Sequence, residues 1–212
     1  WPRRHATTRH TWRRSPSGCG PGDGARAVIV LVGFMGAGKS TVGRSLADRL
    51  GLPFLDSDTV IEERAGRSIA QVFASDGESA FRALEAATIA DLLDGPSAVL
   101  SLGGGACGNP TTRGRLAGHT VVHLEVSFDQ ALARVGADPR RPVLAAPDLA
   151  DRYAARQADY ARVATVTVRT DARRPGEVAA EIAAALAADA GRAARLVHVG
   201  PDGPGGYDVL VG

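Results

Sequence analysis

The sequence predicts an α/β fold in which helices cover both faces of a five-stranded parallel sheet. Between residues 27 and 190, short apolar runs alternate with longer stretches of helical periodicity. Such alternation is typical of β-α-β units, whose parallel strands need a crossover connection. The first run, residues 27–32, contains no polar residue, as expected of a strand that is buried on both faces.

The segment after this first strand is a candidate phosphate-binding loop. GFMGAGKST, at 33–41, fits the pattern G-x-x-x-x-G-K-[ST], and a helical pattern from Ser40 to Leu50 ends at Gly51. A strand before the loop and a helix after it distinguish this motif from an ordinary glycine-rich turn. Backbone N–H groups and the helix N-terminus would then face the phosphates. We expect Lys39 to reach the β- and γ-phosphates and Ser40 to ligate Mg²⁺.

The remaining elements follow in alternation. Strands are expected in 52–58, 97–106, 120–126 and 165–170, and helices in 59–66, 68–77, 78–95, 109–118, 127–136, 149–164 and 175–191. Ser68 is placed as an N-cap, and Pro175 stands near the first turn of the last helix. A proline-rich loop at 138–148 interrupts the pattern.

Charged residues and glycines follow the carboxyl ends of the second and third strands. Asp56 and Asp58 close the second strand, and three glycines at 103–105 close the third. In open parallel sheets these ends meet at one edge, where ligands bind. Between these two segments, Arg82 stands near the start of its helix, and the proline-rich loop further along the chain supplies Arg140 and Arg141.

Each of these features also has a structural interpretation. Asp56 or Asp58 could cap the next helix, and Arg82 could be a solvated helix residue. The three glycines could mark only a close crossing of a strand and a helix. A lone cysteine or histidine, such as Cys107 or His123, is more typical of a structural than of a catalytic role.

Taken together, the motifs resemble those of the shikimate kinase family. The matching segments are GFMGAGKST, D-S-D at 56–58, DGESAFRALE at 76–85, SLGGGA at 101–106, RRPVL at 140–144 and the spacing from Arg156 to Tyr160. The resemblance covers about residues 27–190. It implies a three-layer α/β/α P-loop kinase fold with a mobile lid, and ATP-dependent phosphoryl transfer to the 3-hydroxyl of shikimate. It also implies a cytoplasmic monomer.

The resemblance assigns roles to individual residues. ATP binding falls to Gly36, Ala37, Gly38, Lys39, Ser40, Thr41, Arg134, Arg141 and Arg173. Substrate binding falls to Asp58, Arg82, Gly103, Gly104, Gly105 and Arg156. The resemblance assigns the binding of Mg²⁺, which comes together with ATP, to Ser40 and Asp56. It assigns catalysis to Lys39, Asp58 and Arg141. Arg134 and Arg173 would flank the adenine. Two arginines suit a carboxylate, which a guanidinium binds in two places.

Two other functions remain open at this point. A different P-loop kinase, for gluconate or a nucleoside monophosphate, would share the phosphate loop, but the D-S-D, F-R and G-G-G segments favour shikimate. A nucleotide-binding switch with a basic nucleic-acid arm would bind ATP and transfer nothing. The absence of an apolar stretch near the ~20 residues that a membrane span needs predicts no membrane association.

Both ends of the chain differ from the central region. Six arginines against one aspartate give residues 1–26 a net charge of +5, which leaves −3 for the rest of a chain of net charge +2. Their turn-rich composition favours a disordered basic extension over a nucleic-acid-binding arm. At the other end, residues 191–212 are strand-like and resemble the opening strands of 3-dehydroquinate synthase. We therefore expect this tail to begin a truncated second domain.

Overall fold

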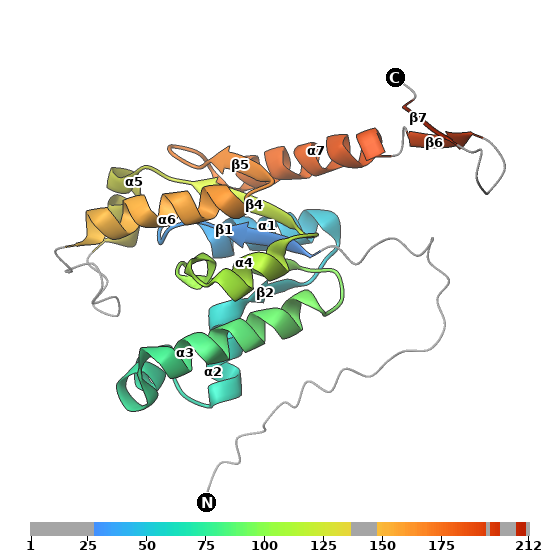
Figure 1. Ribbon diagram of the computed structural model, residues 1–212. Coiled ribbons are helices and arrows are strands. Elements are labelled where there is room, and N and C mark those ends of the chain that lie inside the picture. Colours follow the sequence, from blue (N-terminus) through green and yellow to red (C-terminus); the bar gives the residue numbers. More distant parts are fainter. Residues whose placement is uncertain (1–27, 137–147, 194–195, 200–206, 211–212) are drawn as a thin grey trace, which may run out of the picture.

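The computed structural model describes residues 28–136, 148–193, 196–199 and 207–210. Its main feature is a five-stranded parallel sheet with the strand order β2-β3-β1-β4-β5 (Figure 1). The strands are β1 (Ile29–Val32), β2 (Phe54–Asp56), β3 (Val99–Ser101), β4 (Thr120–Glu125) and β5 (Val166–Arg169). Each of them lies within a segment that the sequence predicts as a strand, so the five-stranded parallel sheet is confirmed.

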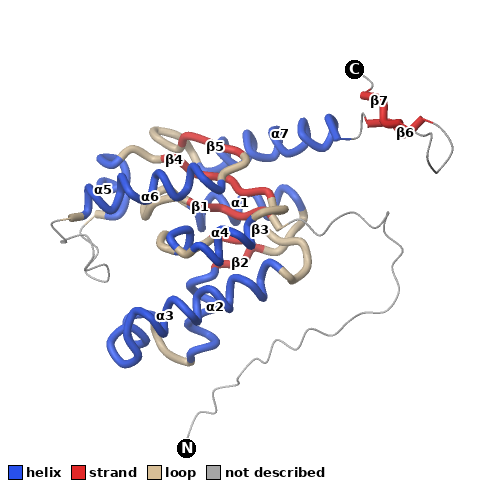
Figure 2. The backbone as a smooth tube through the Cα atoms, viewed as in Figure 1, coloured by secondary structure: helices blue, strands red, loops and turns tan. Residues whose placement is uncertain are grey.

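Helices cover both faces of this sheet. They are α1 (Lys39–Leu50), α2 (Ser57–Ala65), α3 (Ile69–Leu93), α4 (Pro110–Leu116), α5 (Phe128–Val135), α6 (Leu149–Val163) and α7 (Pro175–Ala193), with a 3-10 turn η1 (Ala106–Gly108) before α4. α1 and α7 pack against each other, whereas α6 contacts β4 and η1. Figure 2 shows the red strands between blue helices, and the three-layer α/β/α prediction is confirmed.

The register of the sheet aligns the ends of three strands. Leu31 of β1 and Asp56 of β2 are both paired with Ser101 of β3. Two residues after Leu31, Asp56 and Ser101 stand Gly33, Asp58 and Gly103, respectively. The phosphate loop, the D-S-D triplet and the glycine triplet therefore begin at one edge of the sheet, because parallel strands end there together.

Complete burial of the central strand fixes the position of the loop that follows it. Val30 and Leu31 are fully buried, as the unbroken apolar run predicts. The core continues into the loop itself, where Phe34 and Ala37 are also buried. The loop is thus anchored by apolar side chains at two of its positions, while its glycines leave the backbone free to bind a ligand.

Helix α3 consists of two halves, as the sequence predicts. Ser68 caps the first half through a capping box: its hydroxyl accepts from the Gln71 N–H, and the Gln71 side chain accepts from the Ser68 N–H. Gly77, with φ 81° and ψ 171°, separates the halves, in a conformation that favours glycine. Arg82 therefore stands in the first turns of the second half.

A small second core holds α2 and α3 together at the β2 edge of the sheet. Its buried members are Ile61, Val72 and Phe81. Figure 1 shows these two helices side by side next to β2. Because Phe81 precedes Arg82, this cluster also fixes the position of the predicted substrate-binding arginine.

Several predictions concern segments outside the described residues. These are the basic extension at 1–26 and the predicted lid, with Arg140 and Arg141. In the tail, β6 (Leu196–Val199) pairs with β7 (Tyr207–Leu210) in an antiparallel two-stranded sheet, so the strand-like character is confirmed. Within the described ranges, no helix is long and apolar enough to cross a membrane.

Candidate active site

The phosphate loop forms the wall of a cleft of about 550 Å³. Its lining includes every described residue of the predicted ATP set: Gly36, Ala37, Gly38, Lys39, Ser40, Thr41, Arg134 and Arg173. Gly36 has a positive φ of 77°, and a Cβ there would lie 2.6 Å from the Ala131 carbonyl oxygen. The Lys39 ammonium donates to the carbonyl oxygens of Gly33, at 2.8 Å, and Phe34, at 3.2 Å.

Backbone contacts hold both arginines of this cleft. The Arg134 guanidinium donates to the carbonyl oxygens of Gly36 and Thr170 and to the Thr170 hydroxyl. Arg173 donates to the Arg169 carbonyl oxygen and forms a 2.6 Å ion pair with Glu181. The two side chains that the resemblance assigns to the adenine are therefore brought to the same cleft as the loop.

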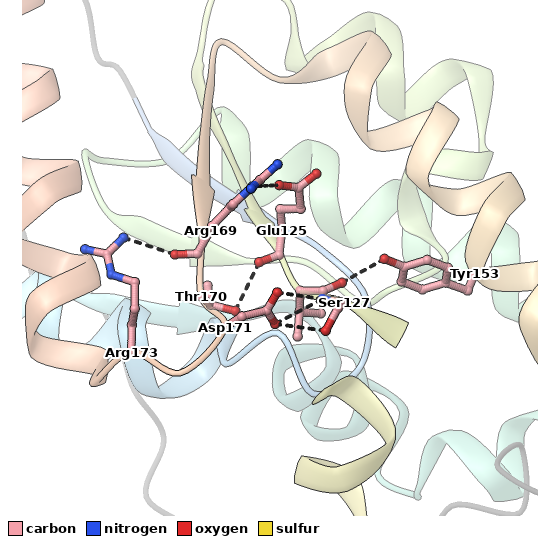
Figure 3. Close-up of polar contacts among 8 residues, drawn as sticks. Glu125, Ser127, Tyr153, Arg169, Thr170, Asp171 and Arg173 are labelled. Atoms are coloured by element: carbon pink, nitrogen blue, oxygen red, sulfur yellow. Dashed lines mark hydrogen bonds and ion pairs between the residues drawn. The ribbon is translucent and has the colours of Figure 1, made fainter. Parts of the chain in front are cut away.

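A hydrogen-bond network that includes Arg173 joins the segments that follow β4 and β5 (Figure 3). The Thr170 hydroxyl donates to the Glu125 carbonyl oxygen, and Asp171 accepts from the N–H and hydroxyl of Ser127. From α6, the Tyr153 hydroxyl donates to the Val126 carbonyl oxygen at 2.8 Å. These bonds tie the segments after β4 and β5 to each other and to α6, and of the residues in the network only Thr170 and Arg173 line the cleft.

Ser40 and Asp56 lie together, as a magnesium site requires. The Ser40 hydroxyl donates to one Asp56 carboxylate oxygen at 3.0 Å. The other oxygen accepts from the Asp58 N–H at 3.1 Å, so Asp56 also caps α2. Capping by Asp56 is thus confirmed, and the Asp58 carboxylate lies against Gly103.

The donor set fits Mg²⁺. Hydroxyl and carboxylate oxygens are ligands that this ion accepts, and it takes its other ligands from phosphates and water. Among the described residues, no cluster of three or more His, Cys, Asp or Glu side chains suits a metal ion. A metal held by few protein ligands and by the nucleotide is consistent with that finding.

Each glycine of the 103–105 triplet faces one predicted substrate-binding side chain. A Cβ on Gly103 would lie 2.5 Å from an Asp58 carboxylate oxygen, and one on Gly104 would lie 3.2 Å from the Arg156 guanidinium. A Cβ on Gly105 would lie 2.9 Å from the Arg82 guanidinium. The absence of a Cβ lets all three side chains approach the backbone closely, so the triplet is a shared floor for Asp58, Arg82 and Arg156.

Arg82 and Arg156, but not Asp58 or Gly103, border a second cleft of about 480 Å³. It is lined by Arg82, Gly104, Gly105, Cys107, Gly108, Asn109, Arg152, Ala155, Arg156, Asp159 and Tyr160. Arg82 and Arg156 thus reach one cavity from α3 and α6, although 74 positions separate them in the sequence. Two guanidinium groups in one cleft suit a carboxylate ligand.

Comparison with known proteins decides the family. The family model "Shikimate kinase" matches residues 35–187. The chain belongs to the shikimate kinase family. A shikimate kinase of Mycobacterium avium (strain 104) is 49% identical over 170 residues, which cover 78% of this chain and 97% of the relative. One of Mycobacterium bovis (strain BCG / Pasteur 1173P2) is 50% identical over 161 residues, covering 74% and 92%.

Solved structures of the family have the same fold. The shikimate kinase from Acinetobacter baumannii, solved in complex with shikimate, aligns with a TM-score of 0.74 and 35% identity over 78% of this chain and 95% of its own. That from Aquifex aeolicus aligns with a TM-score of 0.68 and 34% identity, covering 76% and 97%.

Sequence reasoning missed a buried carboxylate in this shikimate kinase. Glu85 is 2% exposed and pairs with Arg82 at 2.8 Å. The available signal was its spacing: Glu85 lies four residues after Phe81 and four before Ile89, on the inner stripe of α3. An acid on an apolar stripe indicates a buried partner. Asn109, Arg152 and Asp159 also line the second cleft without having been predicted.

The pKa of the Asp58 carboxyl group lies much closer to neutral pH than that of an ordinary aspartate. Burial raises its pKa from 3.8 to about 6, and the negative charges of Asp56, Glu85 and Glu62 add to the rise, whereas Lys39 opposes it. A carboxylate with such a pKa is largely ionised above pH 7. It also accepts a proton more readily than an ordinary aspartate, as a catalytic base requires.

Cys107 and His123 have structural environments. Burial raises the pKa of the Cys107 thiol to about 12, so this thiol stays protonated although it borders the second cleft. Burial lowers the pKa of His123, whose ring packs against Tyr160. Both findings agree with the structural interpretation of these two residues.

Proposed function

We propose that this chain transfers the γ-phosphoryl group of ATP to the 3-hydroxyl of shikimate, giving ADP and shikimate 3-phosphate. One observation carries the proposal: Asp58, Arg82 and Arg156 converge on the glycine triplet, at the edge of the sheet where the phosphate loop begins. Family membership and a relative solved in complex with shikimate support the same substrate.

Recognition of shikimate follows from the charges of the second cleft. Arg82 and Arg156 bind the carboxylate, and Asp58 accepts a hydrogen bond from the reacting hydroxyl. Glu85 holds Arg82 in place, because the buried Glu85 carboxylate needs the positive charge and hydrogen bond of the guanidinium to offset its lost hydration. A neutral polyol would offer the two guanidinium groups no anionic ligand, and Arg82 would keep only its ion pairs with Glu78 and Glu85.

The reaction itself is mainly positioning and charge neutralisation. The 3-oxygen of shikimate forms a bond to the γ-phosphorus, and the bond to the β–γ bridging oxygen breaks, with its electron pair leaving on ADP. Asp58 takes the hydroxyl proton as the new bond forms. Lys39 turns its ammonium from the loop carbonyls to the γ-phosphate and stabilises the charge that develops on its oxygens.

Three further roles rest on the resemblance. Ser40 and Asp56 would hold Mg²⁺, the latter through water, and the ion when bound supplies positive charge to the phosphates. Arg141, in the proposed mobile lid, would contact the phosphates, and closure of the lid would exclude water and prevent ATP hydrolysis. Arg134 and Arg173 would flank the adenine.

The same proposal extends to the whole protein. We infer a cytoplasmic monomer that binds neither nucleic acid nor a membrane. The kinase domain comprises residues 27–190, and residues 191–212 form a separate tail. The antiparallel pairing of β6 and β7 supports a tail with its own strand structure.

A substrate panel tests the proposed function. ADP release by the full chain is measured with Mg-ATP and, in turn, shikimate, gluconate, a nucleoside monophosphate or no acceptor. We expect ADP release that depends on shikimate and is lost in Asp58→Asn. Stimulation by gluconate or by the nucleoside monophosphate in place of shikimate would identify a different kinase. ATP binding without any acceptor-dependent turnover would support the alternative function, a nucleotide-binding switch that transfers no phosphoryl group.

A further inference from the structure

Tyr160 is a buried tyrosine whose hydroxyl reaches the floor of the second cleft. It comes from α6, is 1% exposed and belongs to the largest fully buried side chains of the described residues. Its hydroxyl donates to the Gly104 carbonyl oxygen at 2.7 Å. This bond joins α6 to the glycine triplet, which is separated from it by 56 positions in the chain.

The same hydroxyl lies beside the Arg156 guanidinium. Arg156 precedes Tyr160 by four residues, so the two side chains share one face of α6. A Cβ on Gly104 would be 3.2 Å from the guanidinium and 3.7 Å from the hydroxyl, so both groups meet the same glycine. Burial raises the pKa of Tyr160, against the charge and hydrogen bonding of Arg156, and the hydroxyl remains protonated.

His123 closes the other side of the tyrosine ring. The two ring centroids are 5.2 Å apart, and His123 of β4 is 4% exposed. Its Nε2 atom has no hydrogen-bond partner among the described residues. The tyrosine ring is therefore packed against the sheet, with its hydroxyl directed at Gly104 and Arg156.

We propose that Tyr160 is a positioning residue for the carboxylate-binding site: its hydroxyl, fixed by the Gly104 carbonyl, sets where the Arg156 guanidinium lies above the glycine triplet. The inference rests on the proposed function, because the ligand it concerns is the shikimate carboxylate. Tyr160 acts through Arg156 and does not take part in phosphoryl transfer.

The test compares shikimate with its uncharged carboxamide in the full-length chain. Tyr160→Phe keeps the ring and removes the hydroxyl. We expect the KM for shikimate to rise roughly fivefold, the effect of losing about one hydrogen bond, with kcat changed less than about twofold. The carboxamide should show no such increase, because it lacks the charge that Arg156 binds.

Two control variants separate positioning from a structural role. Tyr153→Phe removes the other hydroxyl of α6, which bonds to the Val126 carbonyl oxygen, and should not change the ratio of the two KM values. In an Arg156→Ala background, Tyr160→Phe should add no further loss for shikimate. Equal losses for both substrates, or additive losses in the double variant, would overturn the proposal.

A second measurement does not depend on replacing Tyr160. The chain has three tyrosines, so the ring carbon signal of Tyr160 in a ¹³C-tyrosine NMR spectrum can be assigned with Tyr153→Phe and Tyr207→Phe. Shikimate should shift the Tyr160 signal in the wild type and not in Arg156→Ala. An unshifted signal in a wild type that does turn over shikimate would refute the inference alone, whereas absent turnover would refute the proposed function.

Discussion

Asp58 combines its proposed catalytic role with an electrostatic cost to the stability of the fold. Its pKa of about 6 means that the folded protein holds the ionised carboxylate less favourably than the unfolded chain does. The folded state binds the proton more tightly, so the free energy of unfolding decreases as pH rises from about 4 to about 6 and is level above that range. The site therefore reduces stability at neutral pH in return for a reactive carboxylate.

Replacing Asp58 by Asn should stabilise the protein while inactivating it. At pH 7.5 we expect the free energy of unfolding to rise by about 1–3 kcal/mol and kcat to fall by about 10²–10⁴-fold. The gain should vanish below pH 4, where the wild-type carboxyl is protonated. Denaturant unfolding at several pH values measures this. Asp48→Asn, at an exposed position of α1, should show neither effect, and a destabilised Asp58→Asn at pH 7.5 would contradict the electrostatic account.

The close approach of Gly103 to Asp58 makes a second prediction at the residue scale. A Cβ at this glycine would stand 2.5 Å from the Asp58 carboxylate and 3.3 Å from that of Glu85. Gly103→Ala should displace Asp58 and lower kcat/KM by about 10²-fold, the cost of misplacing a reacting group by about 1 Å. Steady-state kinetics and a thermal melt measure the two effects.

Gly114→Ala is the matched control for that substitution. Gly114 is exposed in α4, and a Cβ there would meet nothing within 4 Å. Since alanine favours a helix by about 0.5–1 kcal/mol over glycine, this variant should be slightly more stable and fully active. If Gly103→Ala kept the wild-type kcat/KM, the triplet would not be the floor of the substrate site.

At the scale of elements, we expect the capped first half of α3 to open locally while the rest of the domain stays folded. Its residue Val72 packs in the small cluster with Ile61 and Phe81, apart from the main core. Local opening of such a unit costs less free energy than global unfolding. The second half, which carries Arg82, begins only after Gly77.

Removing the cap of α3 should therefore loosen this region with little effect on catalysis. Ser68→Ala breaks the capping box and should cost about 1 kcal/mol, seen as faster amide exchange at Gln71 and Val72. The KM for shikimate should change less than about twofold. Ser45→Ala, a serine inside α1, should leave exchange in α3 unchanged, whereas protection of Gln71 retained in Ser68→Ala would show that the cap is dispensable.

The elements themselves could be predicted because their signals are local. The apolar run at 27–32, the glycine at 51 and the serine at 68 each act through neighbouring residues, and each proved correct. The order of the strands was not predicted, because crossover helices allow several orders. Glu85 and the bond from Tyr160 to Gly104 depend on how α3 and α6 pack, and no local pattern encodes that.

At the scale of the whole molecule, two clefts are built from segments that follow the carboxyl ends of the strands. One is bordered by the phosphate loop with α5, α7 and the segment after β5, and the other by Gly104 and Gly105 with α3 and α6. Family resemblance supplied the pairing of Arg82 with Arg156, which sequence spacing alone does not encode. All described residues of the candidate site lie between 36 and 173.

Removing residues 1–26 should leave the kinase activity intact. Every described residue of the candidate site lies outside this segment, so kcat/KM for shikimate should stay within about twofold of the full chain. Neither form should bind a short DNA duplex tightly at physiological salt. Enzyme kinetics and a fluorescence-anisotropy titration measure this. Tight DNA binding by the full chain that disappears on truncation would favour the nucleic-acid arm.

The most direct test of the central claim is the chemical identity of the product. The full chain is incubated with Mg-ATP and shikimate, and the reaction is followed by ³¹P NMR. The account predicts one new phosphate monoester, coupled to the proton on carbon 3 of shikimate, formed in step with ADP. Release of inorganic phosphate alone, or an ester at another hydroxyl, would contradict the placement of the acceptor beside Asp58.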